Sequence, residues 1–219
     1  MNTLTTSPLA PLLTRLFAQA AEATSPAAAA IPRDERERLM RSKTEYRGFY
    51  GLLKDLWLPV SPETGRLLYL LARSANAHNV VEFGTSFGIS TLHLAAALRD
   101  NGGGRLITTE FEPSKIARAR EHVVEAGLGD LVDFREGDAL ETLGAHLPES
   151  VDLLLLDGAK SLYGDVLDLI EPRLRPGALV IADNVDYSPD YLARIRSAGG
   201  GYLSLPFDKD VELSIRLHC

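Results

Sequence analysis

The stretch Val80-Val81-Glu82-Phe83-Gly84-Thr85-Ser86-Phe87-Gly88-Ile89-Ser90 contains a strand end, a glycine turn and a helix start. Its apolar beginning reaches the acidic residue Glu82, and two glycines follow before a helical pattern starts at Ile89. A strand that turns through glycines into a helix is the nucleotide-binding corner of a doubly wound α/β fold. The sequence therefore predicts such a fold, with this corner at its centre.

The glycine spacing at this corner argues against a dinucleotide ligand. Pyrophosphate binding needs G-x-G-x-x-G, whereas Glu82 to Gly88 reads E-x-G-x-x-x-G. An acid at the strand end repels phosphate but suits a ligand that carries a cation. S-adenosylmethionine has an ammonium group, a sulfonium group and no phosphate. We therefore interpret the corner as a site for this cofactor and predict a methyltransferase.

The rest of the chain from Asn79 onward alternates between apolar runs and helical patterns, which predicts a Rossmann-like, mostly parallel sheet covered on both faces. Residues 201–205 and 211–217 both alternate with period two, so we expect a closing antiparallel hairpin. The expected strands before it are 79–83, 105–110, 131–135, 151–157 and 178–183, and the expected helices are 88–100, 113–127, 138–146, 161–172 and 188–198.

Residues 1–60 are expected to form a helical extension ahead of a methyltransferase domain at 61–219. An amphipathic helix is predicted at 9–23, a connector at 24–32 and a charged helix at 34–53. Ser61 and Pro62 are suited to the N-cap and first position of a further helix that ends near residue 75. We expect the extension to cover the substrate or to contact a second copy in a homodimer.

Composition restricts the partners and the location. A net charge of -7 gives no general attraction to nucleic acid or to anionic membranes, so we expect neither as a partner. The single cysteine, Cys219, cannot form a disulfide framework or a thiolate metal site. The first ten residues lack the basic and apolar regions of a signal peptide. We expect a cytoplasmic enzyme.

Polar residues at the other strand ends are the next candidates, because ligands of such sheets bind beyond the carboxyl ends of the strands. Glu110 ends the second strand, where a carboxylate can accept both ribose hydroxyls, although it could simply cap the next helix. Asp138 is placed for an adenine edge or, alternatively, as an N-cap. Ser90 could bind the methionine carboxylate or serve as a cap hydroxyl.

Asp157, Asp183 and Asn184 follow two strands that we expect to be neighbours. Together they offer hard oxygen ligands without histidine or cysteine, which suits Mg²⁺, Mn²⁺ or Ca²⁺ rather than zinc. The alternative is that they begin loops and cap a helix. Lys160 lies three residues after Asp157 and could act as a general base, since a nearby cation favours its neutral form. A solvated loop lysine is the alternative.

This set of residues resembles the metal-dependent class I O-methyltransferases of the catechol and caffeoyl-coenzyme A type. The similarity extends from about Val60 to the C-terminus and rests on these motifs: Val60-Ser61-Pro62-Glu63-Thr64-Gly65, the turn at 82–90, Glu110, Gly137-Asp138-Ala139, Asp157-Gly158-Ala159-Lys160, and Asp183-Asn184 with Tyr187. Three features depart from the family: Gly158-Ala159 replaces an Ala-Asp pair, Tyr187 stands where tryptophan is frequent, and Asp210-Val211 replaces Asp-Gly. These loops wall the acceptor pocket, so the departures leave the acceptor open.

The resemblance implies a role for each matching residue. Asp157, Asp183 and Asn184 are expected to hold the divalent metal, and Lys160, together with Asp157, to be catalytic. The residues expected to contact S-adenosylmethionine are Glu82, Gly84, Ser90, Glu110, Asp138, Ala139 and Asp157.

The expected reaction is methyl transfer to a hydroxyl of a small molecule, with a catechol or another phenol as the main candidate acceptor. Five side chains are candidate apolar walls for a flat acceptor, with ordinary packing as their alternative: Trp57, Leu58, Tyr46, Tyr187 and Phe207. Two other functions stay open, a metal-independent methyltransferase acting on nitrogen or a tRNA base, and a non-catalytic cofactor-binding module.

Overall fold

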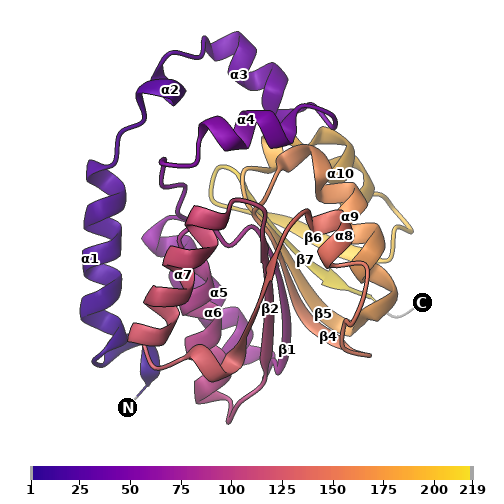
Figure 1. Cartoon of the computed structure of the whole chain (residues 1–219). Coiled ribbons are helices and arrows are strands. Elements are labelled where there is room, and N and C mark those ends of the chain that lie inside the picture. Colours follow the sequence, from indigo (N-terminus) through magenta and orange to yellow (C-terminus); the bar gives the residue numbers. More distant parts are fainter. Residues whose placement is uncertain (1, 218–219) are drawn as a thin grey trace.

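A seven-stranded sheet forms the centre of the computed structural model, which describes residues 2–217 (Figure 1). The strand order is β3-β2-β1-β4-β5-β7-β6; β7 runs antiparallel to both β5 and β6, and the other pairs are parallel. The predicted doubly wound sheet with a C-terminal antiparallel hairpin is thus confirmed. Cys219 lies outside the described residues. The strands are β1 (Asn79–Phe83), β2 (Arg105–Glu110), β3 (Val132–Glu136), β4 (Val151–Leu156), β5 (Leu174–Ala182), β6 (Tyr202–Phe207) and β7 (Val211–Arg216).

Helices cover both faces of this sheet, as strands buried on both sides require. Val80 packs into a cluster with α1, α5 and α6, whereas its neighbour Val81 packs into a second cluster with α8, α9 and α10. The α-helices are α1 (Leu9–Glu22), α2 (Pro26–Ala29), α3 (Arg33–Met40), α4 (Tyr46–Leu52), α5 (Pro62–Ser74), α6 (Ile89–Asp100), α7 (Pro113–Glu125), α8 (Ala139–Thr142), α9 (Tyr163–Ile170) and α10 (Pro189–Ile195). None of the helices between residues 2 and 217 has the length and hydropathy needed to cross a bilayer.

The strand order reverses between β1 and β4, and the ends of these strands approach each other closely. Gly84, just after β1, has a φ of +103°, and a Cβ atom there would lie 2.6 Å from the backbone oxygen of Asp157. Only glycine fits both the backbone conformation and the contact. The reversal point of such a sheet is where ligands bind, so this glycine brings the first turn to the end of β4 at the expected site.

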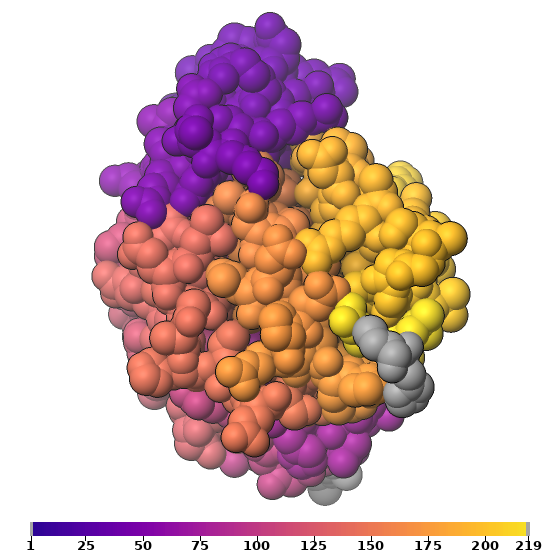
Figure 2. Space-filling model, turned by 90° about the vertical axis from the view of Figure 1, so that its right-hand side faces the viewer, coloured from indigo at the N-terminus to yellow at the C-terminus, as the bar shows by residue number. Residues whose placement is uncertain are grey.

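The first helices occupy two different places. Four leucines of α1 are buried against the sheet-covering helices, because their spacing puts them on one helix face: Leu9, Leu12, Leu13 and Leu16. Helices α2 to α4 instead form a cap above one end of the sheet (Figure 1). In the space-filling view this cap projects from the top of the molecule (Figure 2).

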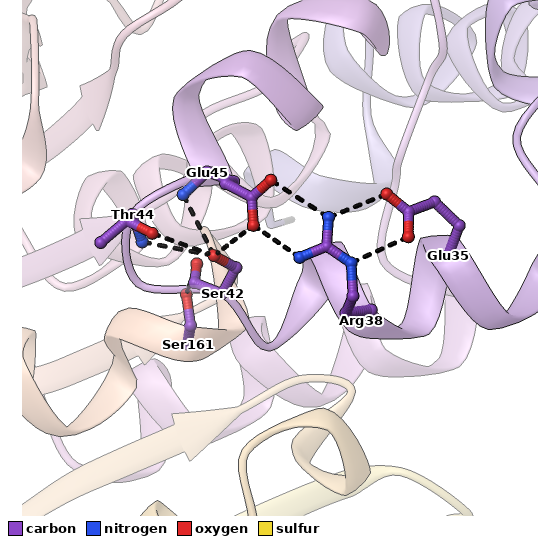
Figure 3. A network of polar contacts seen from close by, with 6 residues as sticks. All are labelled: Glu35, Arg38, Ser42, Thr44, Glu45 and Ser161. Carbon is purple, nitrogen blue, oxygen red and sulfur yellow. Dashed lines mark hydrogen bonds and ion pairs between the residues drawn. The ribbon is translucent and has the colours of Figure 1, made fainter.

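The expected single helix at 34–53 is two helices, α3 and α4, with a turn at 41–45. The hydroxyl of Ser42 accepts hydrogen bonds from the backbone N–H groups of Thr44 and Glu45 (3.4 and 3.1 Å; Figure 3). A serine that bonds to nearby backbone groups competes with the helix, which explains the break. The expected helix at 138–146 is also shorter, since α8 ends at Thr142 and His146 adopts a positive φ of 56°.

Candidate functional site

A cavity of about 660 Å³, open to solvent, lies at the carboxyl ends of β1, β2, β3 and β4; we call it the strand-end cavity. Five of the seven residues predicted to contact the cofactor line it: Gly84, Glu110, Asp138, Ala139 and Asp157. The structure therefore brings together residues from four separate strand ends. Ser90 lines a smaller adjoining pocket.

Glu110 is held in place by the backbone on both sides. Its two carboxylate oxygens accept hydrogen bonds from the N–H groups of Ser86 (2.9 Å) and Glu112 (3.1 Å). Burial raises the pKa of Glu110, while the charge of Lys115 and these N–H groups oppose that rise. Lys115 is itself buried, lines the same cavity and lies 5.5 Å from the centre of the Phe87 ring. This carboxylate is thus fixed before any ligand arrives.

Ser86 provides an independent indication that the strand-end cavity is built for a polar ligand. Its hydroxyl is buried and has no hydrogen-bond partner among the described residues. A buried polar group without a partner is costly, so it points to a ligand that completes it. A nucleoside with ribose hydroxyls near Glu110 and Ser86 fits this chemistry.

Glu82 lies beneath the glycine turn. It is fully buried, it accepts hydrogen bonds from the hydroxyls of Thr91 and Thr108 (both 2.6 Å), and burial raises its pKa to about 7. Glu82 is not among the described residues that line the strand-end cavity. Its side chain ties β1 to α6 and β2, and a direct contact with the cofactor stays a prediction.

Asp138 has two structural partners besides the cavity. Its carboxylate caps α8 through the N–H of Leu140 (2.8 Å), and it accepts hydrogen bonds from Tyr46 and Arg47 of α4 (2.6 Å to Arg47 Nη2). Burial alone opposes ionisation, but these donors lower the pKa of Asp138. The N-cap alternative is therefore observed, and Asp138 also anchors the cap formed by α2 to α4 over the strand-end cavity.

A second cavity, of about 730 Å³ and open to solvent, lies between the cap and the ends of β4 and β5; we call it the cap cavity. Asp157, Lys160, Asp183 and Asn184 all line it, as expected for residues at neighbouring strand ends. The strand-end cavity and the cap cavity share four lining residues: Tyr50, Leu58, Asp157 and Gly158. The two cavities therefore meet at the end of β4.

Lys160 forms a buried ion pair with Asp157, with 2.8 Å between Nζ and Oδ1 and 6% and 10% of the two side chains exposed. Burial alone lowers the pKa of Lys160, but the carboxylate of Asp157 raises it well above its usual value. Lys160 is thus charged in this arrangement. A role as a general base stays a prediction and needs a further positive charge nearby.

The remaining predicted metal ligands fit a divalent cation by their chemistry. Burial and the charge of Asp157 raise the pKa of Asp183 to about 8, because two carboxylates share one site. Asn184 donates its amide nitrogen to Asp210 (3.0 Å), which leaves its carbonyl oxygen free to act as a ligand. Among residues 2–217, no three histidine, cysteine or acidic side chains form a metal cluster. The predicted metal site therefore needs the amide oxygen of Asn184 as its third protein ligand.

Tyr50 is a candidate that the sequence did not reveal. Its hydroxyl is buried, has no hydrogen-bond partner in the described part of the chain, and belongs to a residue that lines both cavities. Burial raises its pKa, with the nearby charge of Lys160 opposing that rise. On α4, Tyr50 follows Phe49, and nothing in the local pattern distinguishes a cap residue from ordinary packing.

The five predicted apolar walls separate into two groups. Tyr46, Trp57 and Leu58 line the cavities or the adjoining pocket, and Trp57 stacks on Phe87 with 4.3 Å between ring centres. Tyr187 and Phe207 are not among the described residues that line them. The apolar wall of the cap cavity comes mainly from residues that the sequence did not single out: Met40, Phe49, Leu53 and Leu56.

Comparison with known proteins agrees with this geometry. A family model described as a methyltransferase domain matches residues 81–185. A catechol O-methyltransferase from Niastella koreensis is 38% identical over 131 residues, which cover 58% of this chain and 58% of that protein. A catechol O-methyltransferase from Mycobacterium tuberculosis is 33% identical over 153 residues, which cover 70% of this chain and 64% of that protein. The matched segments thus span less than two thirds of these relatives.

The similarity to one solved structure covers most of both chains. The O-methyltransferase TomG from Streptomyces achromogenes, solved in complex with S-adenosylmethionine, superposes with a TM-score of 0.63 and is 27% identical. The superposition covers 88% of this chain and 94% of that one.

Proposed function

We propose that the chain is a class I S-adenosylmethionine-dependent O-methyltransferase, and that it transfers a methyl group to a hydroxyl of a small catechol or phenol with the help of a divalent cation. Its similarity to proteins named O-methyltransferases supports this proposal. One observation carries the proposal: the strand-end cavity and the cap cavity meet at Asp157. A methyl donor in the first cavity and a hydroxyl in the second then face each other at that junction. This is the geometry that group transfer between two bound molecules requires.

In this proposal the strand-end cavity holds S-adenosylmethionine, the cofactor bound in the related TomG structure. Glu110 and Ser86 bind its ribose, because both are fixed there and the Ser86 hydroxyl lacks a partner. The acidic lining suits the positive charge of the cofactor, which supplies a methyl group bonded to a sulfonium. Tyr46 and Arg47 hold the cap closed through Asp138 and keep water from the junction.

The cap cavity holds the acceptor. Asp157, Asp183 and the carbonyl oxygen of Asn184 would hold the cation, which would lower the pKa of an acceptor hydroxyl and add positive charge beside Lys160. Lys160 would first lose one proton from Nζ to solvent, because the added positive charge favours its neutral form, and the neutral Nζ would then receive the hydroxyl proton. The flat ring of a catechol packs against the apolar side chains of the cap, which orients its oxygen toward the junction at Asp157.

The decisive experiment is a methyl-transfer assay on catechol with S-adenosylmethionine and Mg²⁺. We expect O-methylated product that disappears after treatment with EDTA and returns when Mg²⁺ or Mn²⁺ is added back. Full activity in EDTA would refute the proposed metal dependence. If no methyl group is transferred to any of the catechols, flavonoids and caffeoyl thioesters tested, the proposed activity is refuted.

Tyr50 should contribute to turnover through its hydroxyl. Replacing it by phenylalanine keeps the ring and removes only the unpartnered oxygen. If that oxygen bonds to the acceptor, kcat/KM should fall about 5–10-fold, the scale of one neutral hydrogen bond, while thermal stability stays unchanged or rises.

Tyr191→Phe is the matched control for Tyr50→Phe. The hydroxyl of Tyr191 is also buried without a partner, but Tyr191 packs against Tyr163 and is absent from the cavity linings among the described residues. We expect normal kinetics for Tyr191→Phe. Equal kinetics for Tyr50→Phe and the wild type would remove Tyr50 from the site.

The homodimer and the cytoplasmic location expected from the sequence are also part of the proposal. Sedimentation of the purified chain tests the first, and fractionation of the source cells tests the second.

A further inference from the structure

The lining of the cap cavity contains one cation that the proposed reaction does not use. Two positively charged residues line this cavity, Lys160 and Arg36. Lys160 is paired with Asp157. Arg36 belongs to α3, and Figure 1 shows α3 farther from the sheet than α4. The cavity thus has a hydroxyl-binding end at the strands and a separate positive charge on the cap.

Arg36 differs from the other arginines of its helix. Arg33 pairs with Glu37, and Arg38 pairs with both Glu35 and Glu45. Arg36 forms no ion pair with another described residue. Its guanidinium donates a hydrogen bond to the backbone oxygen of Ala28 (2.8 Å). Its guanidinium therefore keeps donors free for an anionic partner.

The surrounding contacts fix the position of α3. Arg38 joins α3 to the turn before α4 through its ion pairs with Glu35 and Glu45. Ser161, which follows Lys160, donates its hydroxyl to the backbone oxygen of Ser42 (3.0 Å; Figure 3). Lys43 also pairs with Asp165 of α9 (2.6 Å). Arg36 is thus held over the cavity by a cap that is fastened to the sheet domain.

The wall of the cap cavity is otherwise largely apolar, since it includes Met40, Phe49, Leu53, Leu56 and Leu58. An anion at the strand ends would face Asp157 and Asp183, so electrostatics favour placing it at Arg36. The carboxylate geometry matches a guanidinium fork. The cap cavity thus fits a molecule with hydroxyls at one end, a hydrophobic ring, and a negative group at the other end.

We infer that the acceptor carries a carboxylate and that Arg36 binds it, which makes hydroxylated aromatic acids the substrate class. This inference rests on the proposed O-methyl transfer and deepens it. Arg36 determines specificity and does not take part in the chemical step, because it lines the cavity from the cap and the hydroxyl-binding side chains lie at the strand ends.

The test compares acids with their methyl esters. Methyl transfer to 3,4-dihydroxybenzoate, 3,4-dihydroxycinnamate and the methyl ester of each is measured with the full chain, S-adenosylmethionine and Mg²⁺. We expect the wild type to prefer at least one acid over its ester. Arg36→Gln should raise the KM for that acid about 10-fold, the scale of an exposed charged hydrogen bond, and leave the ester and kcat unchanged.

Arg33→Gln is the matched control, because Arg33 stands on the same helix with 93% of its side chain exposed and is not among the described residues that line the cavity. It should behave as the wild type. If Arg36 only supports the cap through Ala28, Arg36→Gln will change the KM of acid and ester equally, and the inference is wrong. A second outcome also overturns the inference. If Arg36→Gln leaves the KM for the free acid unchanged but raises the KM for 3,4-dihydroxycinnamoyl-coenzyme A, Arg36 binds the phosphates of coenzyme A.

Failure of the proposed function can be distinguished from failure of the inference about Arg36. If no acceptor is methylated, calorimetry of the acid and the ester with S-adenosylhomocysteine and Mg²⁺ still decides the inference. Binding of the acid that is about 10-fold weaker in Arg36→Gln supports it. Equal binding in both proteins, or no binding in either, overturns it.

Discussion

Asp157→Ala is expected to lower turnover about 100-fold or more, as loss of a metal template implies. Asp157 stands at the junction of the two cavities, and its charge raises the pKa of both Lys160 and Asp183. Its removal takes away one proposed metal ligand and the partner of the proposed base together. The measurement is kcat at saturating acceptor and cofactor, with calorimetry to show that S-adenosylmethionine binding is largely intact.

Stability must be measured beside the turnover of Asp157→Ala. Loss of one partner from a buried ion pair costs about 3–5 kcal/mol, because the other charge stays buried and unpaired. Asp157→Asn keeps the shape of the side chain and removes its charge, so it separates the loss of charge from the loss of packing. Asp165→Ala removes a more exposed pair, with Lys43, and should leave both properties nearly unchanged. Full turnover of folded Asp157→Ala in EDTA would contradict both the metal and the role of this carboxylate.

Glu110→Ala is expected to weaken cofactor binding by about 1.5–3 kcal/mol, the range for a hydrogen bond to a charged group. The two N–H groups that fix the Glu110 carboxylate make it rigid, so little ordering is needed when ribose hydroxyls arrive. Calorimetry with S-adenosylhomocysteine measures the loss of affinity directly. The KM for the acceptor, measured at saturating cofactor, should change little.

Glu136→Ala is the matched control for Glu110→Ala. Glu136 lies opposite Glu110 in the register of β3 and β2, it ends its strand in the same way, and it is exposed. It is not among the described residues that line the strand-end cavity. If both variants bind the cofactor as tightly as the wild type, the ribose role of Glu110 is refuted.

The strand ends could be predicted because their signal is local. Each strand is an apolar run that stops at a polar residue, and parallel strands place all these stops at one edge. Glu110 and Asp157 were found in this way, and both line the strand-end cavity. Glu82 belongs to the same pattern, but the structure buries it beneath the turn. A pattern locates the strand end without telling whether the side chain points to the ligand or into the sheet.

The cap could not be predicted in the same way. Tyr50 and Arg36 lie on a cap that is held to the sheet by contacts with residues more than 100 positions later, such as that of Ser42 with Ser161. Their own surroundings in the sequence are a charged, weakly patterned stretch that reads as one solvated helix. The turn at 41–45 depends on Ser42, and it is this turn that folds α3 and α4 over the cavity.

The sequence by itself determined the sheet, the glycine corner and the set of polar residues at the strand ends, because periodicity and turn chemistry act over a few neighbouring residues. Only the tertiary structure decided that two cavities meet at Asp157, that Glu82 lies under the turn, and that Tyr50 and Arg36 line the cap cavity. Burial and pairing across long sequence separations are properties of the packed chain, and no local pattern contains them.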